Sequence, residues 1–178
     1  MTVILGIDPG SRRAGFGIVT LVGGRPEYLA SGLIRTRKSA LAERLGEIHA
    51  GTAELMAHYQ PAVVAVEDVF VARDPRAALR LGQARGAAIA AVAAAGIAVI
   101  EYSPRTVKQA VVGTGAATKE QVQRMVMQIL RLPSAPPADA ADALAVAICH
   151  AHAGTGAMPL GARRRGRARS LAELGLGA

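Results

Sequence analysis

The chain has 178 residues, which is the size of one domain of roughly 100–200 residues. Apolar residues make up 51% of it, so it can bury a core without disulfides or structural metals. Lysine and arginine exceed aspartate and glutamate by 8, which makes a polyanion such as nucleic acid the first partner to consider. The single cysteine, Cys149, excludes an intramolecular disulfide and a cysteine-rich zinc site.

The sequence predicts neither a membrane span nor a signal peptide. The longest uncharged run, residues 86–100, is shorter than the ~18 residues that cross a bilayer. The N-terminal apolar run reaches Asp8 without a basic region before it. Together with the lone cysteine, these features predict a cytoplasmic protein.

The first third of the chain predicts three strands: residues 2–7, 15–21 and 28–36. They are separated by Asp-Pro-Gly and Gly-Gly turn signals, and connections this short favour an antiparallel meander. From Leu41 to Tyr59, apolar residues recur every three or four positions, which predicts a helix that Pro61 ends.

The middle third predicts a strand, a helix and a second strand. Residues 62–66 and 97–100 are short apolar runs without polar alternation, as is typical of strands buried on both faces. Between them, Asp74 and Pro75 have the character of an N-cap and a first helical residue, and the alanine-rich helix should reach Ala95. A strand-helix-strand order predicts that the two strands are parallel.

The last third predicts three helices: residues 105–112, 118–132 and 138–152. From Gly154 the composition changes to glycine, arginine and small residues, with five arginines against one glutamate. We therefore expect a domain over residues 1–153 and a disordered basic tail over 154–178. The order of elements predicts an α/β domain with a mixed five-stranded sheet flanked by helices on both faces.

Four carboxylates are candidates for chemistry. Asp8 and Glu67 each follow a buried strand, at the carboxyl ends where α/β sheets place their ligand sites. Asp139 and Asp142 lie three residues apart on a predicted helix and therefore share a face. Oxygen donors of this kind suit Mg²⁺ or Mn²⁺, and two such ions roughly 3.5–4 Å apart can promote hydrolysis of a phosphodiester. Taken singly, each residue also fits a turn or a solvated helix end, and Glu101 is a weaker candidate of the same kind.

Several basic residues and one aromatic residue are candidates for DNA contacts: Phe70, Arg73, Arg76, Arg80, Arg85, Arg105, Lys108 and Lys119. Many of them follow Glu67 or open a predicted helix, a spacing that would line a groove with phosphate contacts or form a solvated face. Phe70 lies in the polar connection after Glu67, where an aromatic ring either stacks on bases or packs under its own loop.

Five segments resemble the bacterial RuvC family of Holliday junction resolvases: GIDPGS at 6–11, EDVF at 67–70, LRLGQARG at 79–86, VKQ at 107–109 and ADAADALA at 138–145. The resemblance runs in order from about Val3 to His152 and leaves only the tail uncovered. It implies a ribonuclease H-like fold, a homodimer, and Mg²⁺-dependent nicking of two opposed strands of a four-way DNA junction. It also implies a branch-migration helicase complex of the RuvA and RuvB type as partner.

The resemblance also implies roles for individual residues. Four residues match its catalytic, metal-binding carboxylates: Asp8, Glu67, Asp139 and Asp142. Lys108 and Lys119 match its active-site lysines, and Phe70 matches the aromatic residue that inserts into the junction. The site would hold two Mg²⁺ ions, with Mn²⁺ as a substitute, and cleavage of the phosphodiester would leave 5′-phosphate and 3′-hydroxyl ends.

Three features depart from the family pattern, namely Asp68 beside Glu67, Arg76, and the arginine-rich tail. They bear on DNA affinity and sequence preference, and strand alternation predicts that Asp68 points away from Glu67. Two other functions stay open: a non-catalytic protein that binds branched DNA, and a ribonuclease H-like nuclease that acts on RNA. Cleavage in Mg²⁺ separates the first from a resolvase, and substrate competition separates the second.

Overall fold

The structure is a computed structural model, and it describes residues 1–68 and 74–154. Within these ranges the elements follow in the order β1 (Thr2–Asp8), β2 (Arg13–Val22), β3 (Arg25–Arg35), α1 (Leu41–Tyr59), β4 (Val63–Glu67), α2 (Pro75–Ala94), β5 (Ala98–Tyr102), α3 (Pro104–Val112), α4 (Lys119–Leu130) and α5 (Ala138–Gly154). Phe70, Arg73 and the predicted tail beyond Gly154 lie outside the described residues.

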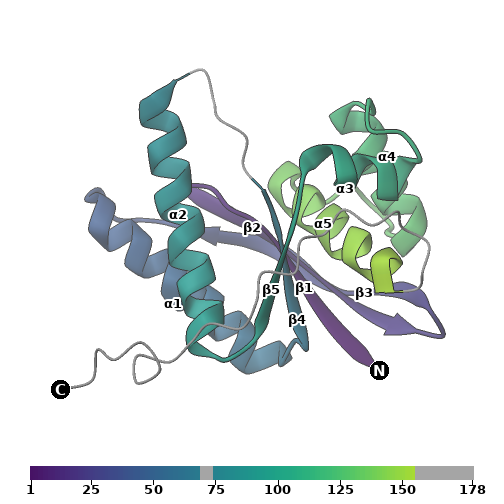
Figure 1. Cartoon of the computed structure of the whole chain (residues 1–178), viewed down its shortest axis with the longest axis horizontal. Helices are drawn as coiled ribbons and strands as arrows, with labels where there is room; N and C mark the ends of the chain where they lie inside the picture. Colours follow the sequence, from purple (N-terminus) through teal and green to yellow (C-terminus); the bar gives the residue numbers. More distant parts are fainter. Residues whose placement is uncertain (69–73, 155–178) are drawn as a thin grey trace, which may run out of the picture.

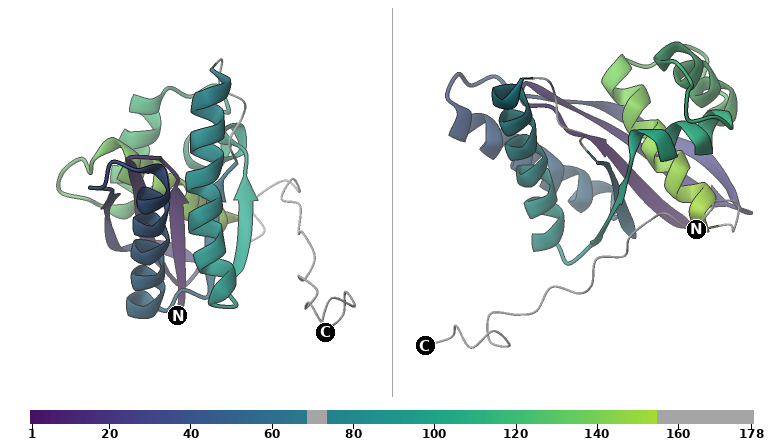
Figure 2. Two further views of the ribbon diagram at one scale, coloured as in Figure 1. Left: turned by 90° about the vertical axis from the view of Figure 1, so that its left-hand side faces the viewer. Right: turned by 45° about the horizontal axis from the view of Figure 1, so that its top comes forward.

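The strands form one mixed sheet in the order β3-β2-β1-β4-β5. β1, β2 and β3 make the predicted antiparallel meander, and β4 pairs in parallel with both β1 and β5. Helices α1 and α2 cover one face of this sheet, whereas α3, α4 and α5 cover the other (Figures 1 and 2). The prediction of a five-stranded mixed sheet with helices on both faces is confirmed.

Alternate residues of β1 and β4 face opposite helical layers. Four of them pack with α1 and α2: Leu5, Ile7, Val64 and Val66. Ile4 and Ala65 instead pack in the core with α5. Asp8 has the same parity in β1 as Ile4, and Glu67 the same parity in β4 as Ala65, so both strand-end carboxylates face the α5 layer.

Helix α5 packs closely on the centre of the sheet because glycines of β1 and β2 face it. A Cβ atom at Gly6 would overlap the carbonyl oxygen of Ala143, and one at Gly15 would overlap that of Asp139. No residue other than glycine fits at these two points unless the helix moves. Gly15 thus fixes the first turn of α5, which carries Asp139, against the start of β2.

Some element bounds differ from the predicted ones. β2 begins at Arg13 instead of residue 15, because Arg13 and Ala14 pair with Arg35 and Ile34 of β3. β3 begins at Arg25 instead of residue 28, because Gly23 and Gly24 adopt positive φ angles (55° and 79°) and make the hairpin turn tight. α4 ends at Leu130, before the predicted residue 132, because Arg131 adopts the left-handed conformation (φ 53°). The predicted capping box of Thr118 and Gln121 is present.

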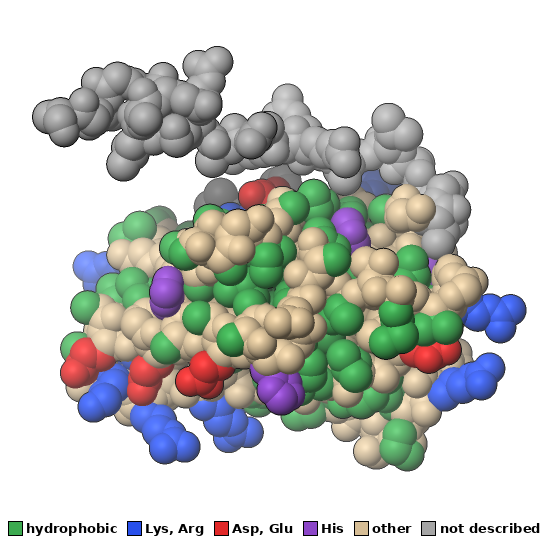
Figure 3. Space-filling view, turned by 90° about the horizontal axis from the view of Figure 1, so that it is seen from below, with side chains coloured by type: hydrophobic (Ala, Val, Ile, Leu, Met, Phe, Trp, Pro, Cys, Tyr) green, Lys and Arg blue, Asp and Glu red, His purple; other side chains and the backbone are tan. Residues whose placement is uncertain are grey.

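None of the helices in residues 1–68 and 74–154 is both long and apolar enough to cross a membrane. Figure 3 shows the molecule from below: hydrophobic and uncharged atoms fill the middle of this face, and the charged side chains lie around its rim, mostly at the left and right. Among the described residues, no continuous basic stripe crosses the middle of this face.

Candidate active site

Asp8 lies at the carboxyl end of β1 in a strongly negative environment. Its pKa is raised to about 7, first by burial and then by the negative charges of Asp142, Glu67 and Asp139, while the positive charge of Lys119 partly opposes this rise. Carboxylates influence one another in this way only when they are close in space. The structure therefore gathers the four carboxylates predicted from sequence at one end of the sheet.

Glu67 lies at the end of β4, the neighbour of β1. Burial raises its pKa, as does the negative charge of Asp142, whereas Lys119 and Lys108 lower it. A cleft of about 220 Å³ opens beside it, lined by Glu67, Pro104, Val107, Lys108, Lys119, Val122, Asp142 and Ala145. The cleft brings the two predicted lysines to the carboxylates, from α3 and α4.

The two carboxylates on α5 each pair with a cation from a different element. Lys119 Nζ, at the first residue of α4, donates to Asp142 Oδ2 at 3.1 Å. Arg13 Nε, at the first residue of β2, lies 2.7 Å from Asp139 Oδ2. The sequence prediction included Lys119 but missed Arg13, whose only signal was its place two residues before Gly15 on the strand that pairs with Asp8.

The donor chemistry of the cluster fits a hard divalent cation, because all four side chains offer carboxylate oxygens and their negative charges repel one another. In the described part of the chain, however, no three histidine, cysteine, aspartate or glutamate side chains are arranged to hold a metal as they stand. The carboxylates of Asp139 and Asp142 are directed at Arg13 and Lys119.

Arg85, predicted to contact DNA, is held by carboxylates on the α2 side of the sheet. Its Nη2 lies 2.9 Å from Glu101 Oε2 and 3.9 Å from Asp68 Oδ1, and its Nε donates to the main-chain oxygen of Glu67 at 3.4 Å. Its side chain is only 19% exposed. Arg85 thus ties α2 to the ends of β4 and β5, and Asp68 points away from the cluster, as strand alternation predicted.

Other predicted DNA contacts lie on exposed surface. Arg76 and Arg80 are exposed on the first turns of α2, where Asp74 accepts a hydrogen bond from the Arg76 backbone N–H as the predicted N-cap. Arg80 also lies 4.0 Å from Asp74. Arg105 is exposed at the start of α3.

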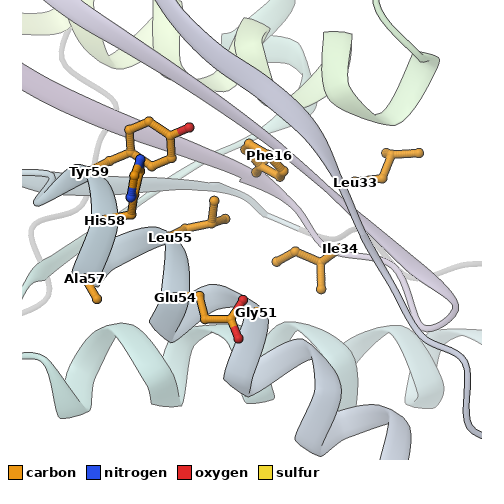
Figure 4. Close-up of a pocket in the computed structure, with 9 residues that line it drawn as sticks. All are labelled: Phe16, Leu33, Ile34, Gly51, Glu54, Leu55, Ala57, His58 and Tyr59. Atoms are coloured by element: carbon orange, nitrogen blue, oxygen red, sulfur yellow. The ribbon is translucent and has the colours of Figure 1, made fainter.

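A larger hollow, of about 710 Å³, lies on the opposite face of the sheet, between α1 and strands β2 and β3 (Figure 4). Its lining is mostly apolar, with Phe16, Leu55 and Tyr59 among the side chains. It contains none of the four carboxylates, so it is separate from the candidate active site.

Comparisons with known proteins show which family the chain belongs to. A sequence model of the family described as "Crossover junction endodeoxyribonuclease RuvC" matches residues 4–150. The chain belongs to the RuvC family. The RuvC of Tolumonas auensis is 57% identical over 152 residues, which cover 85% of this chain and 88% of that protein. The RuvC of Pseudomonas putida is 54% identical over 169 residues, covering 93% and 97% of the two chains.

The fold also matches a solved RuvC structure. The structure titled "T. thermophilus RuvC in complex with Holliday junction substrate" superposes with a TM-score of 0.82 at 40% identity, covering 88% of this chain and 98% of that one. This match confirms the ribonuclease H-like fold that the sequence motifs implied.

Proposed function

We propose that this chain resolves four-way DNA junctions by nicking two opposed strands in a reaction that needs a divalent metal. One observation carries the proposal: four carboxylates from β1, β4 and α5 of a RuvC-family chain are gathered into one negative cluster. The relative in complex with a Holliday junction supports the choice of substrate. The reaction would serve DNA recombination and repair.

Asp8, Glu67, Asp139 and Asp142 would hold the metal, for which we propose Mg²⁺, two ions per site, with Mn²⁺ as a substitute. When bound, such ions supply an activated water and stabilise the leaving 3′ oxygen, so that 5′-phosphate and 3′-hydroxyl ends result. The raised pKa of Asp8 supports this assignment, because a bound cation would offset both the burial and the neighbouring negative charges that favour its protonated form.

The lysines of the cleft would act on the substrate phosphate and on the carboxylates. Lys119 holds Asp142 at 3.1 Å, and its pKa is raised by that hydrogen bond, so it is charged at neutral pH. Lys108 lines the same cleft beside Glu67. Positive charges in these places can offset the charge that builds on the phosphorus in the transition state.

Two nicks in opposed strands require two active sites, whereas the described residues of one chain hold one cluster of this kind. A two-fold homodimer would match the symmetry of a four-way junction. We further propose that the dimer acts in the cytoplasm, together with a branch-migration helicase complex of the RuvA and RuvB type. Phe70, Arg73, Arg76, Arg80 and Arg105 are the proposed additional DNA contacts.

Cleavage and binding assays on the same junction test this function. Asp8→Asn should abolish cleavage in Mg²⁺ and retain junction binding in EDTA, because it removes one charge from the cluster and leaves the exposed basic residues in place. Retained cleavage by this variant would contradict the assignment. A wild-type protein that binds junctions without cutting in Mg²⁺ or Mn²⁺ would point to an architectural protein, and preferential cleavage of RNA–DNA hybrids in competition would point to a ribonuclease.

A further inference from the structure

The backbone around Arg13 places this residue beside Asp139. It is the first residue of β2 and lies two residues before Gly15, so the two positions share a face of the strand. Gly15 packs against the main chain of Asp139, and a Cβ atom at Gly10 would overlap the carbonyl oxygen of Arg13. The tight turn from β1 and the close approach of α5 therefore both direct Arg13 at this carboxylate.

The ion pair that results is short and accessible. Arg13 Nε lies 2.7 Å from Asp139 Oδ2, and the Arg13 side chain is 66% exposed against 28% for Asp139. The guanidinium can thus leave the carboxylate for solvent at small cost, since ion pairs between exposed side chains are weak. A contact of this strength can hold a side chain in place and still be exchanged for a stronger one.

The guanidinium of Arg13 occupies the position beside Asp139 that a metal ion bound to this carboxylate would take. The first turn of α5 already carries the positive end of its helix dipole, so Asp139 is the group that keeps a guanidinium there. A divalent ion bound to the same carboxylate would be repelled by that guanidinium and would have to displace it.

We propose, on the basis of the metal-dependent function proposed above, that Arg13 is a positioning residue that competes with the divalent cation for Asp139. It holds the carboxylate while the site is free of metal and so raises the metal concentration at which the site fills. Loss of the guanidinium should therefore strengthen metal binding.

Titration of the DNA-free protein with Mn²⁺, followed by electron paramagnetic resonance of the free ion, measures this effect without any cleavage. Arg13→Gln should lower the apparent Kd for Mn²⁺ by about twofold to fivefold, the fold-change that corresponds to release of an exposed ion pair. Arg13→Lys keeps the charge and should stay near the wild-type value.

Arg12→Gln is the matched control, because Arg12 is an exposed neighbour of the same charge that makes no ion pair with the described residues. An equal decrease in Kd for both glutamine variants, no change in Arg13→Gln, or weaker binding by it would overturn the competition. The variant Asp8→Asn distinguishes failure of the proposed metal site from failure of the proposed role of Arg13. If Mn²⁺ binding does not depend on Asp8, the proposed metal site fails; if it depends on Asp8 but not on Arg13, only the role of Arg13 fails.

Discussion

Lys119 Nζ donates to Asp142 Oδ2 at 3.1 Å, which joins the first residue of α4 to a carboxylate that α5 contributes to the cluster. The contact depends on where α4 begins, and the capping box of Thr118 and Gln121 fixes that point. A local sequence signal thereby positions the Lys119 ammonium group at a site built from distant segments.

Lys119→Gln should lower the single-turnover cleavage rate by about 10²-fold, because a charge positioned for the transition state is lost. Junction binding in EDTA should be retained, since the other exposed basic residues stay in place. Arg124→Gln, on an exposed position of the same helix, is the control and should cleave at nearly the wild-type rate. Equal losses in the two variants would show that only the net charge of α4 matters.

Asp8→Asn should stabilise the metal-free protein at high pH. The folded-state pKa of Asp8 is about 7, above its ordinary value of 3.8, so the folded chain binds this proton more tightly than the unfolded chain. Stability is therefore lost as the pH rises from about 4 to about 7, by up to about 4 kcal/mol, and the variant escapes this loss.

Denaturant unfolding in EDTA measures this effect. The free energy of unfolding of Asp8→Asn should exceed that of the wild type at about pH 8, and the difference should shrink towards about pH 4. Glu27→Gln, an exposed carboxylate on β3, controls for the change in net charge. A difference that is constant with pH would contradict the burial of a charged Asp8.

Gly15→Ala should damage both stability and cleavage, because its Cβ atom would overlap the carbonyl oxygen of Asp139. We expect a loss of about 1–3 kcal/mol in the free energy of unfolding, as is typical of overpacking. Gly46→Ala is the control, since that glycine is exposed on α1 with open space around it and should gain about 0.4–1 kcal/mol. Normal cleavage by Gly15→Ala would show that the first turn of α5 can shift without consequence.

Arg85 and Glu101 should act as one unit in a double-mutant cycle. Arg85→Met and Glu101→Gln each remove one side of a 2.9 Å contact, and we expect a coupling energy of about 0.5–3 kcal/mol in unfolding experiments. If Arg85 also contacted a phosphate, its loss would reduce the slope of the logarithm of the binding constant against the logarithm of the salt concentration by about one. We expect an unchanged salt dependence for Arg85→Met and a reduced one for Arg105→Gln.

The parts of this structure that follow from local patterns were predicted well from the sequence. The buried apolar runs of β4 and β5, the cap of α2 at Asp74 and the spacing of Asp139 and Asp142 all depend on neighbouring residues. These patterns also placed Asp8 and Glu67 at strand ends, which is why the cluster was foreseen.

The parts that depend on distant contacts were not predicted. Arg13 reaches Asp139 because β2 and α5 meet at Gly15, a contact between segments more than a hundred residues apart in sequence. Arg85 is charged like a surface residue, but the sheet places Glu101 and Asp68 beside it. A charge on a predicted helix does not show which strand end will lie next to it.

A denaturing-gel assay on a four-way DNA junction with a mobile core, with each strand labelled in turn, tests the central claim most directly. We predict paired nicks at symmetric positions in opposed strands, present with Mg²⁺ and absent with EDTA. Tight binding without nicks across several core sequences, with Mg²⁺ or Mn²⁺, would contradict the claim and leave the cluster around Asp8 without its proposed role.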